Sequence, residues 1–251
     1  MPSCFKYANI VPIPKCPHPS DLSDFRPISL LPVLSKIFEK IVVTKIILPI
    51  VSRRVGISQF AYISRPGSGP VSALVLAYHK IVEFLDKSLG AVRLLSVDFS
   101  KAFNKLLHSC IVSACVDFEL PSYAINWIAS FLSGRKQRVF VDGRASSWSS
   151  VTSGVPQGSI LGPILFCLAV DSLSPVCDNS HIIKYADDVS VFHFVRNQTQ
   201  DMLQLEWDNL VQWSHTMHLP LNFLKCNVTD FVTKKNLSLS RVSLHDGTFL
   251  E

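Results

Sequence analysis

Two adjacent carboxylates interrupt the most strongly β-forming stretch of this sequence. The β-forming run 182–185 leads through Ala186 into Asp187 and Asp188, and a second β-forming run, 189–194, follows at once. β-Branched and aromatic residues on both sides of a short acidic turn predict a β-hairpin whose tip presents both carboxylates. Alone, an acidic pair of this kind is usually only a solvated turn, so its meaning depends on the rest of the chain.

A second predicted strand, 91–97, also ends in an acid, Asp98. If the two strands are neighbours in one sheet, Asp98 and Asp187 converge from distant parts of the chain. Carboxylates held together raise each other's pKa unless a cation lies between them. Mg²⁺ suits such a site, because it binds a few carboxylates together with water and substrate phosphates. The chemistry implied is phosphoryl transfer on two metal ions.

Three motifs occur in this chain in a fixed order with long spacers. They read Ser96-Val97-Asp98-Phe99-Ser100-Lys101-Ala102-Phe103, Ser153-Gly154-Val155-Pro156-Gln157-Gly158-Ser159 and Tyr185-Ala186-Asp187-Asp188. Each is weak alone, but their joint order resembles the reverse transcriptase of non-LTR (LINE-type, jockey-like) retrotransposons. The similarity extends to 5–15 and 25–32 near the start and to Trp213 and 221–226 near the end, and so covers nearly the whole chain.

The resemblance implies an α+β fold, the palm of a right-hand polymerase, in which helices back a small antiparallel sheet, joined by fingers. One reverse transcriptase domain is expected over 1–251, mostly fingers in about 1–90 and mostly palm in about 91–235. The thumb is expected to be absent or truncated, because the chain ends at about the place where it would begin.

Hydrophobic spacing and turn residues predict the elements of this fold independently. A hairpin should pair 137–141 with 148–152. The expected helices are 33–47, 71–85, 101–115, 123–132, 159–172 and 200–216.

The resemblance also implies roles for the acidic residues. Asp98 and Asp187 would hold two Mg²⁺ ions, with Mn²⁺ as an alternative metal, and Asp188 would assist or orient. The backbone carbonyl of Phe99 is a further expected ligand. Lys225 would protonate the leaving pyrophosphate as a general acid.

Other matching positions are expected to contact the incoming deoxynucleoside triphosphate. Phe103 would lie beneath its sugar and exclude a 2′-hydroxyl. Gln157 and Gly158 lie in a turn where the backbone approaches nucleotide and template, and Lys15 and Arg26 would clamp the phosphates. For each position an ordinary structural role stays open: helix packing for Phe103, a plain turn for 157–158, and a solvated surface for the basic residues.

A basic hairpin could follow the backbone of an RNA template or a DNA primer. Its cations are Arg135, Lys136 and Arg138, and a simple solvated edge is the alternative interpretation. The net charge of +5 fits a phosphate-backbone partner without requiring one.

Composition excludes several other classes of protein. Seven scattered cysteines with no CxxC pair favour reduced thiols over a disulfide framework or a zinc site. The longest apolar stretch, 41–51, is too short for a membrane span and contains Lys45 and Pro49. Because the N-terminus does not resemble a signal peptide, we expect an intracellular protein without membrane contact.

Two departures from the family pattern concern activity, namely Asn104 where the family usually has aspartate and Ala61 where many relatives have glycine. A catalytically decayed palm that only binds RNA would keep the fold, but it would have no reason to retain Asp98, Asp187 and Asp188 together. A different metal-dependent phosphotransferase would explain the acids, but not the Pro-Gln-Gly turn or Phe103.

Overall fold

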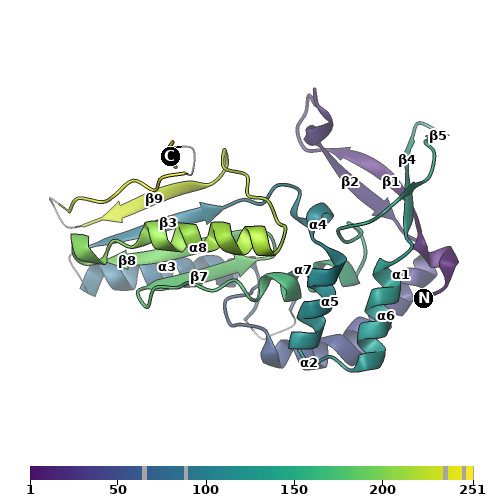
Figure 1. The fold of residues 1–251 in the computed structure, drawn as a ribbon, viewed down its shortest axis with the longest axis horizontal. Helices are drawn as coiled ribbons and strands as arrows, with labels where there is room; N and C mark the ends of the chain where they lie inside the picture. Colours follow the sequence, from purple (N-terminus) through teal and green to yellow (C-terminus); the bar gives the residue numbers. More distant parts are fainter. Residues whose placement is uncertain (64–66, 88–89, 234–236, 245–246, 251) are drawn as a thin grey trace. The chain divides into compact units, whose positions relative to one another are not determined.

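The computed structural model describes residues 1–63, 67–87, 90–233, 237–244 and 247–250. The chain forms two compact units, each made of two separate segments (Figure 1). The first unit comprises Met1–Val55 and Phe103–Ala169, and the second comprises Gly56–Ala102 and Val170–Glu251. The assignment of 1–90 to mostly fingers and 91–235 to mostly palm stays a prediction.

The second unit is built on a four-stranded antiparallel sheet in the order β7-β8-β3-β9. Its strands are β7 (Ser180–Tyr185), β8 (Asp188–Val195), β3 (Ala91–Val97) and β9 (Asn227–Val232). The predicted acidic hairpin is therefore confirmed as β7–β8. The strand that pairs with β3 is the returning strand β8, so the two strands that end in acids are second neighbours.

Helices cover both faces of this sheet: α3 (Pro70–Lys87) lies on one face and α8 (Leu203–Thr216) on the other (Figure 1). The α3 face buries a core cluster that includes Val92, Phe192 and Phe194. On the opposite face, Trp207 of α8 is almost fully buried. Both predicted helices are confirmed, with ends that differ by at most three residues.

The first unit holds a second sheet, in the order β2-β1-β4-β5, with β6 also paired to β4. Strands β1 and β4 run parallel, and the other pairs are antiparallel. The strands are β1 (Tyr7–Pro14), β2 (Phe25–Leu30), β4 (Lys136–Val141), β5 (Arg144–Ala145) and β6 (Ser149–Ser150). Pairing of β4 with β6 confirms the predicted hairpin, although only Ser149 and Ser150 of the second arm are paired.

The remaining helices follow the predicted order with two interruptions. They are α1 (Val33–Val42), α2 (Leu48–Arg54), α4 (Ala102–Lys105), α5 (His108–Asp117), α6 (Ser122–Leu132) and α7 (Leu161–Val170). A π-helical segment, η3 (Val43–Ile47), joins α1 to α2. The expected helix 101–115 is broken between α4 and α5, because Leu107 is extended and Leu106 is fully buried, with its carbonyl accepting the amide of Gly154.

Short 3₁₀ helices complete the described elements: η1 (Ser3–Lys6), η2 (Leu22–Asp24) and η4 (Gln198–Gln200). In the described part of the chain, no helix combines the length and the apolar character that a membrane span needs.

Candidate active site

The carboxylates of the second unit meet at one end of its sheet. The β3–β8 register pairs Val97 with Val189, so the next position of each strand sets Asp98 opposite Asp188. Asp187 precedes Asp188 in the turn that joins β7 to β8. The register thus places Asp188 across from Asp98. The predicted convergence of Asp98 with Asp187 stays a prediction.

The turn that presents these acids makes a hydrogen bond to the side chain of Gln59, which is fully buried. Ala186 has a left-handed backbone with φ of 56°, and its amide donates to Gln59 Oε1 at 3.2 Å. Such a backbone conformation is costly for a residue with a Cβ, so it persists only where the surroundings hold it in place. A buried amide side chain therefore fixes the position of the acidic turn.

Asp98 is held by Asn222, a residue that the sequence analysis did not single out. The side-chain amide of Asn222 donates to Asp98 Oδ2 at 2.9 Å, and its backbone amide donates to the Asp98 carbonyl at 2.8 Å. Lys225 Nζ lies 3.9 Å from the same Oδ2. Asn222 lies three residues before Lys225, in the same segment that carries the resemblance. Its place in that segment is the sequence feature that could have indicated a role beside Asp98.

A cavity of about 1450 Å³ lies at this end of the sheet in the second unit. Its lining includes Asp98, Asp188, Lys225 and residues 96–97 at the end of β3. Within the described ranges, no three His, Cys, Asp or Glu side chains gather closely enough to enclose a metal ion. Two carboxylates facing an open cavity nevertheless fit Mg²⁺, because this ion keeps several waters and takes its remaining ligands from substrate phosphates.

Phe99 follows Asp98 and packs inward. Its side chain is 5% exposed, and its ring centroid lies 5.9 Å from that of Trp213. Its backbone forms an isolated antiparallel bridge with Leu221. This bridge joins the segment after β3 to the segment that carries Asn222 and Lys225, which explains how Asp98 and Lys225 come together. The expected role of the Phe99 carbonyl as a metal ligand stays a prediction.

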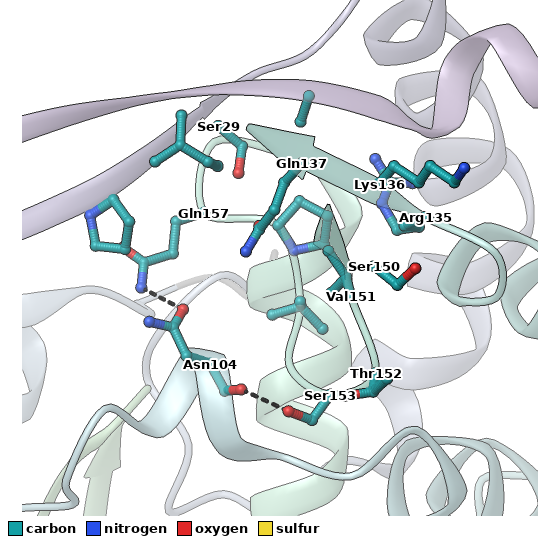
Figure 2. A pocket seen from close by; sticks show the side chains of 15 residues that line it. Ser29, Asn104, Arg135, Lys136, Gln137, Ser150, Val151, Thr152, Ser153 and Gln157 are labelled. Carbon is teal, nitrogen blue, oxygen red and sulfur yellow. Dashed lines mark hydrogen bonds between the residues drawn. The ribbon is translucent and has the colours of Figure 1, made fainter. Parts of the chain in front are cut away.

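In the first unit, the Pro-Gln-Gly turn packs against β2 and the α4 region. Gln157 accepts the Ser29 amide on its carbonyl at 2.6 Å, and its side-chain amide donates to Asn104 Oδ1 at 3.0 Å (Figure 2). Gly158 has φ of 113°, and a Cβ there would lie 2.8 Å from the Ser29 carbonyl oxygen. The close approach that requires glycine is therefore made to the chain's own strand β2.

Asn104 acts as an acceptor toward this turn. Its side-chain oxygen accepts from Gln157, and its backbone carbonyl accepts from the Ser153 hydroxyl at 3.0 Å (Figure 2). An aspartate at this position would offer the same side-chain acceptor. Asparagine therefore preserves the local hydrogen bond that an aspartate would make.

Gly154 sits where two backbone segments touch. Its φ is +77°, and a Cβ would lie 2.5 Å from the Phe103 carbonyl oxygen and 2.6 Å from Asn104 Cα. We expect Gly154→Ala to lower the free energy of unfolding by more than about 2 kcal/mol, because backbone strain and a backbone clash add. Urea unfolding followed by circular dichroism measures this loss.

Gly143→Ala is the matched control for that substitution. Gly143 has nearly the same φ, +76°, but its Cβ would meet nothing within 4 Å. This variant introduces the backbone strain without the clash, so its free energy of unfolding should fall by only about 1 kcal/mol. Equal losses for the two variants would show that the tight contact at Gly154 does not exist in solution.

Phe103 is half-buried and stacks on Phe166, with ring centroids 4.5 Å apart and planes inclined by 23°. Phe166 itself is fully buried. One face of the Phe103 ring is thus supported by the core of the first unit, while part of the side chain stays accessible. This arrangement suits both a packing role and a rigid ring that limits what can lie beside it.

Lys15 and Arg26 lie at the same end of the β1–β2 hairpin, since Ile13 pairs with Arg26 and Lys15 follows two residues later. Both residues are exposed. The Lys15 amine donates to the Ser23 carbonyl at 2.7 Å. The structure therefore brings the two predicted phosphate-binding cations to one hairpin, within the first unit.

A smaller cavity of about 240 Å³ lies between the Pro-Gln-Gly turn and the sheet of the first unit (Figure 2). Its polar lining includes Ser29, Asn104, Gln137, Ser153 and Gln157. None of the described residues that line this cavity carries a carboxylate.

Of the three predicted nucleic-acid-binding cations, Arg135 differs from the others in being only 3% exposed. Its guanidinium lies 4.8 Å above the Phe131 ring and donates to the Phe131 carbonyl at 3.0 Å. Burial lowers the pKa of this guanidinium below its ordinary value. Lys136 and Arg138 are the accessible members of the predicted basic hairpin.

Solved polymerases share this fold. A telomerase from Candida tropicalis, truncated from its C-terminal domain, aligns with a TM-score of 0.62 and 14% identity, over 92% of this chain and 51% of that one. The RNA-dependent RNA polymerase of a human picorbirnavirus aligns with a TM-score of 0.57 and 13% identity, over 88% of this chain and 41% of that one. The expected α+β right-hand polymerase fold is confirmed.

Residues 13–238 match the family described as reverse transcriptase (RNA-dependent DNA polymerase), and the chain belongs to this family. The RNA-directed DNA polymerase from mobile element jockey of Drosophila melanogaster is 29% identical over 91% of this chain and 26% of its own length. A probable RNA-directed DNA polymerase from transposon X-element of the same fly is 30% identical over 85% of this chain and 24% of its own length. The resemblance to jockey-like non-LTR elements is confirmed, and the chain spans about a quarter of these relatives.

Proposed function

We propose that this chain is the RNA-directed DNA polymerase portion of a non-LTR mobile element and adds deoxynucleotides to the 3′-hydroxyl of a DNA primer on an RNA template. The observation that carries this proposal is Asp98 set opposite Asp188, with Lys225 beside it, in a member of the reverse transcriptase family. Two Mg²⁺ ions held by Asp98, Asp187 and Asp188 would supply the charge that lowers the pKa of the primer hydroxyl and neutralises the triphosphate.

The chain's own groups then have distinct tasks. Asn222 orients the Asp98 carboxylate toward the cavity. Lys225, an exposed amine 3.9 Å from Asp98, provides a proton to the leaving pyrophosphate. Lys15 and Arg26 hold phosphate oxygens from the β1–β2 hairpin, the latter through its planar guanidinium. Phe103 excludes a sugar that carries a 2′-hydroxyl. The turn at Gln157 and Gly158 brings the protein backbone close to the nucleotide and the template.

Primer extension tests the proposal directly. A labelled DNA primer on an RNA template is incubated with the chain, Mg²⁺ and one deoxynucleoside triphosphate at a time. We expect addition only of the nucleotide complementary to the next template base. A chain that binds the hybrid but adds nothing with Mg²⁺ or Mn²⁺ would overturn the proposal and favour a role confined to RNA binding.

Removal of the Asn222 side chain should weaken the site without dismantling it. We expect Asn222→Ala to lower the rate of nucleotide addition about 10- to 100-fold, because groups that orient a metal ligand typically contribute that much. Raising the Mg²⁺ concentration should recover part of the loss. Rates measured across a Mg²⁺ titration check both expectations.

Asn209→Ala is the control for this variant, since Asn209 is a half-buried residue of the same unit whose side-chain amide donates to the Ser174 carbonyl. It should leave the rate and its Mg²⁺ dependence unchanged. An Asn222→Ala chain with a wild-type Mg²⁺ profile would remove Asn222 from the site.

A further inference from the structure

One face of the sheet in the first unit carries aromatic and basic side chains together. The parallel β1–β4 register pairs Tyr7 with Lys136 and Asn9 with Arg138, which places these four side chains on one face. The intervening residues Ala8 and Ile10 of β1 are buried on the other face. We call the surface formed by Tyr7, Lys136, Arg138 and the neighbouring Trp148 the stacking face.

Contacts hold the two rings of the stacking face in a fixed arrangement. The Tyr7 and Trp148 rings meet edge to face, with centroids 5.0 Å apart and planes at 87°. The Arg138 guanidinium lies 4.5 Å from the centre of the Trp148 ring, and its Nε donates to Asn9 Oδ1 at 2.8 Å. The indole is therefore oriented by two neighbours, one of which is itself anchored to β1.

Burial in a core does not explain the fixed orientation of the Tyr7 and Trp148 rings. Tyr7 and Trp148 are each 41% exposed, so both residues keep a substantial accessible surface. A side chain that fills a core loses nearly all of its exposure, as Trp207 does at 1%. Rings that are fixed and still accessible are suited to receive another planar group.

The surrounding charge favours an anionic partner. From Ser133 to Ile160 the sequence contains four basic residues and a single acid, Asp142, and β1 contains no acidic residue. The cations Lys136 and Arg138 lie on the stacking face itself. Aromatic rings that stack with bases, set among cations that attract phosphates, are the combination that single-stranded nucleic acids bind.

We propose that the stacking face binds an unpaired stretch of a nucleic-acid strand, with a base stacked on Trp148 and the adjacent phosphates near Lys136. The binding itself does not require polymerase activity; only the identification of that strand as the unpaired part of the template rests on the proposed function. The stacking of a base on Trp148 is additional to the phosphate contacts that Lys136 would make as a member of the basic hairpin.

Binding of a labelled 12-nucleotide single-stranded RNA to the 251-residue chain, followed by fluorescence anisotropy without metal or nucleotides, tests this proposal. We expect Trp148→Ala to weaken binding about 5- to 100-fold, the range for loss of one stacked base. Trp148→Phe keeps an aromatic face and should stay within about threefold of wild type. Trp148→Leu keeps apolar volume without an aromatic face, and it should lose affinity as the alanine variant does.

Two further measurements separate stacking from charge. An oligomer with abasic sites should bind the wild-type chain and the three Trp148 variants with the same affinity, because it keeps the phosphates and lacks the bases. The slope of log affinity against log salt concentration should be unchanged in Trp148→Ala, because that slope reports phosphate contacts, whereas Lys136→Ala should make it shallower. A DNA 12-mer run in parallel shows whether the face prefers RNA or accepts either strand.

Tyr123→Ala provides the matched control, since Tyr123 is a 62% exposed aromatic on α6 of the same unit. It should bind like wild type. Wild-type affinity in both Trp148→Ala and Trp148→Leu would overturn the proposal and leave the face open to a protein partner. That result would not touch the polymerase assignment, because a chain whose Trp148 variants bind normally can still extend primers.

Discussion

Replacement of Asp98 with asparagine should reduce nucleotide addition at least about 1000-fold. A metal ion that neutralises developing charge contributes several kcal/mol to a transition state, and each 1.4 kcal/mol corresponds to a tenfold change in rate. Asparagine has nearly the same shape, but it lacks the negative charge that would hold the ion opposite Asp188. Single-nucleotide addition measured under single-turnover conditions gives the ratio of rates directly.

The same substitution should leave folding and nucleic-acid affinity nearly unchanged. The ion pair between Asp98 and Lys225 is long, at 3.9 Å, and its side chains are 37% and 67% exposed. Ion pairs of this kind contribute only about 0–1 kcal/mol to stability. An asparagine oxygen can also still accept from Asn222. Urea unfolding and anisotropy with a labelled primer–template check both points.

Asp178→Asn is the control that separates a local effect from a general loss of charge. Asp178 is an exposed acid just before β7 in the same unit, so its replacement changes the net charge equally. It should retain the wild-type rate. Rapid nucleotide addition by Asp98→Asn would show that the carboxylate opposite Asp188 is not the one that the reaction needs.

The acidic hairpin could be predicted from sequence because its determinants are local. β-Forming residues on both sides of a two-residue turn specify β7 and β8 without help from the rest of the chain. Its pairing partner required more than local information: β3 had to be assigned to the same sheet. Local pattern indicated which strands end in acids, whereas the position of Asp188 across from Asp98 follows only from the register of β3 and β8.

Long-range partners account for what the sequence left open. Arg93 is a charged residue in a mostly apolar strand, and it is only 3% exposed because Asp201 and Asp230 pair with it from 108 and 137 residues away. Asn104 was noticed only as a departure from a family pattern, whereas its contact is with Gln157, 53 residues later. No periodicity reports pairs of this kind, since each partner has an ordinary local context.

Arg135 illustrates the same difficulty for charge. In the sequence it belongs to a run of basic residues after α6, and such runs are usually solvated. In the fold its side chain turns back onto Phe131, four residues earlier. There the guanidinium lies over the Phe131 ring and donates to the Phe131 carbonyl, and it is buried from solvent. Among the described residues, one of its terminal nitrogens has no hydrogen-bond partner. Sequence alone could not separate it from Lys136, which is exposed.

Replacement of Phe103 with valine should relax discrimination between deoxyribonucleotides and ribonucleotides. The ring is held against the buried Phe166, so it cannot easily move aside for a 2′-hydroxyl. Small steric differences in a substrate pocket correspond to about 10- to 200-fold in selectivity. We therefore expect the ratio of kcat/KM for a deoxyribonucleotide to kcat/KM for its ribonucleotide to fall by a factor in that range.

Phe166→Val separates this steric role from ordinary packing. It removes the other half of the same stacked pair, and both variants should lose stability of about 1–3 kcal/mol, because each exchanges a large apolar side chain for a smaller one. Only Phe103→Val takes away the ring that is expected beside the sugar. Equal stability losses combined with a selectivity change confined to Phe103→Val would assign the steric role. If both variants keep the wild-type ratio, Phe103 is a core residue, and discrimination against the 2′-hydroxyl must come from elsewhere in the chain.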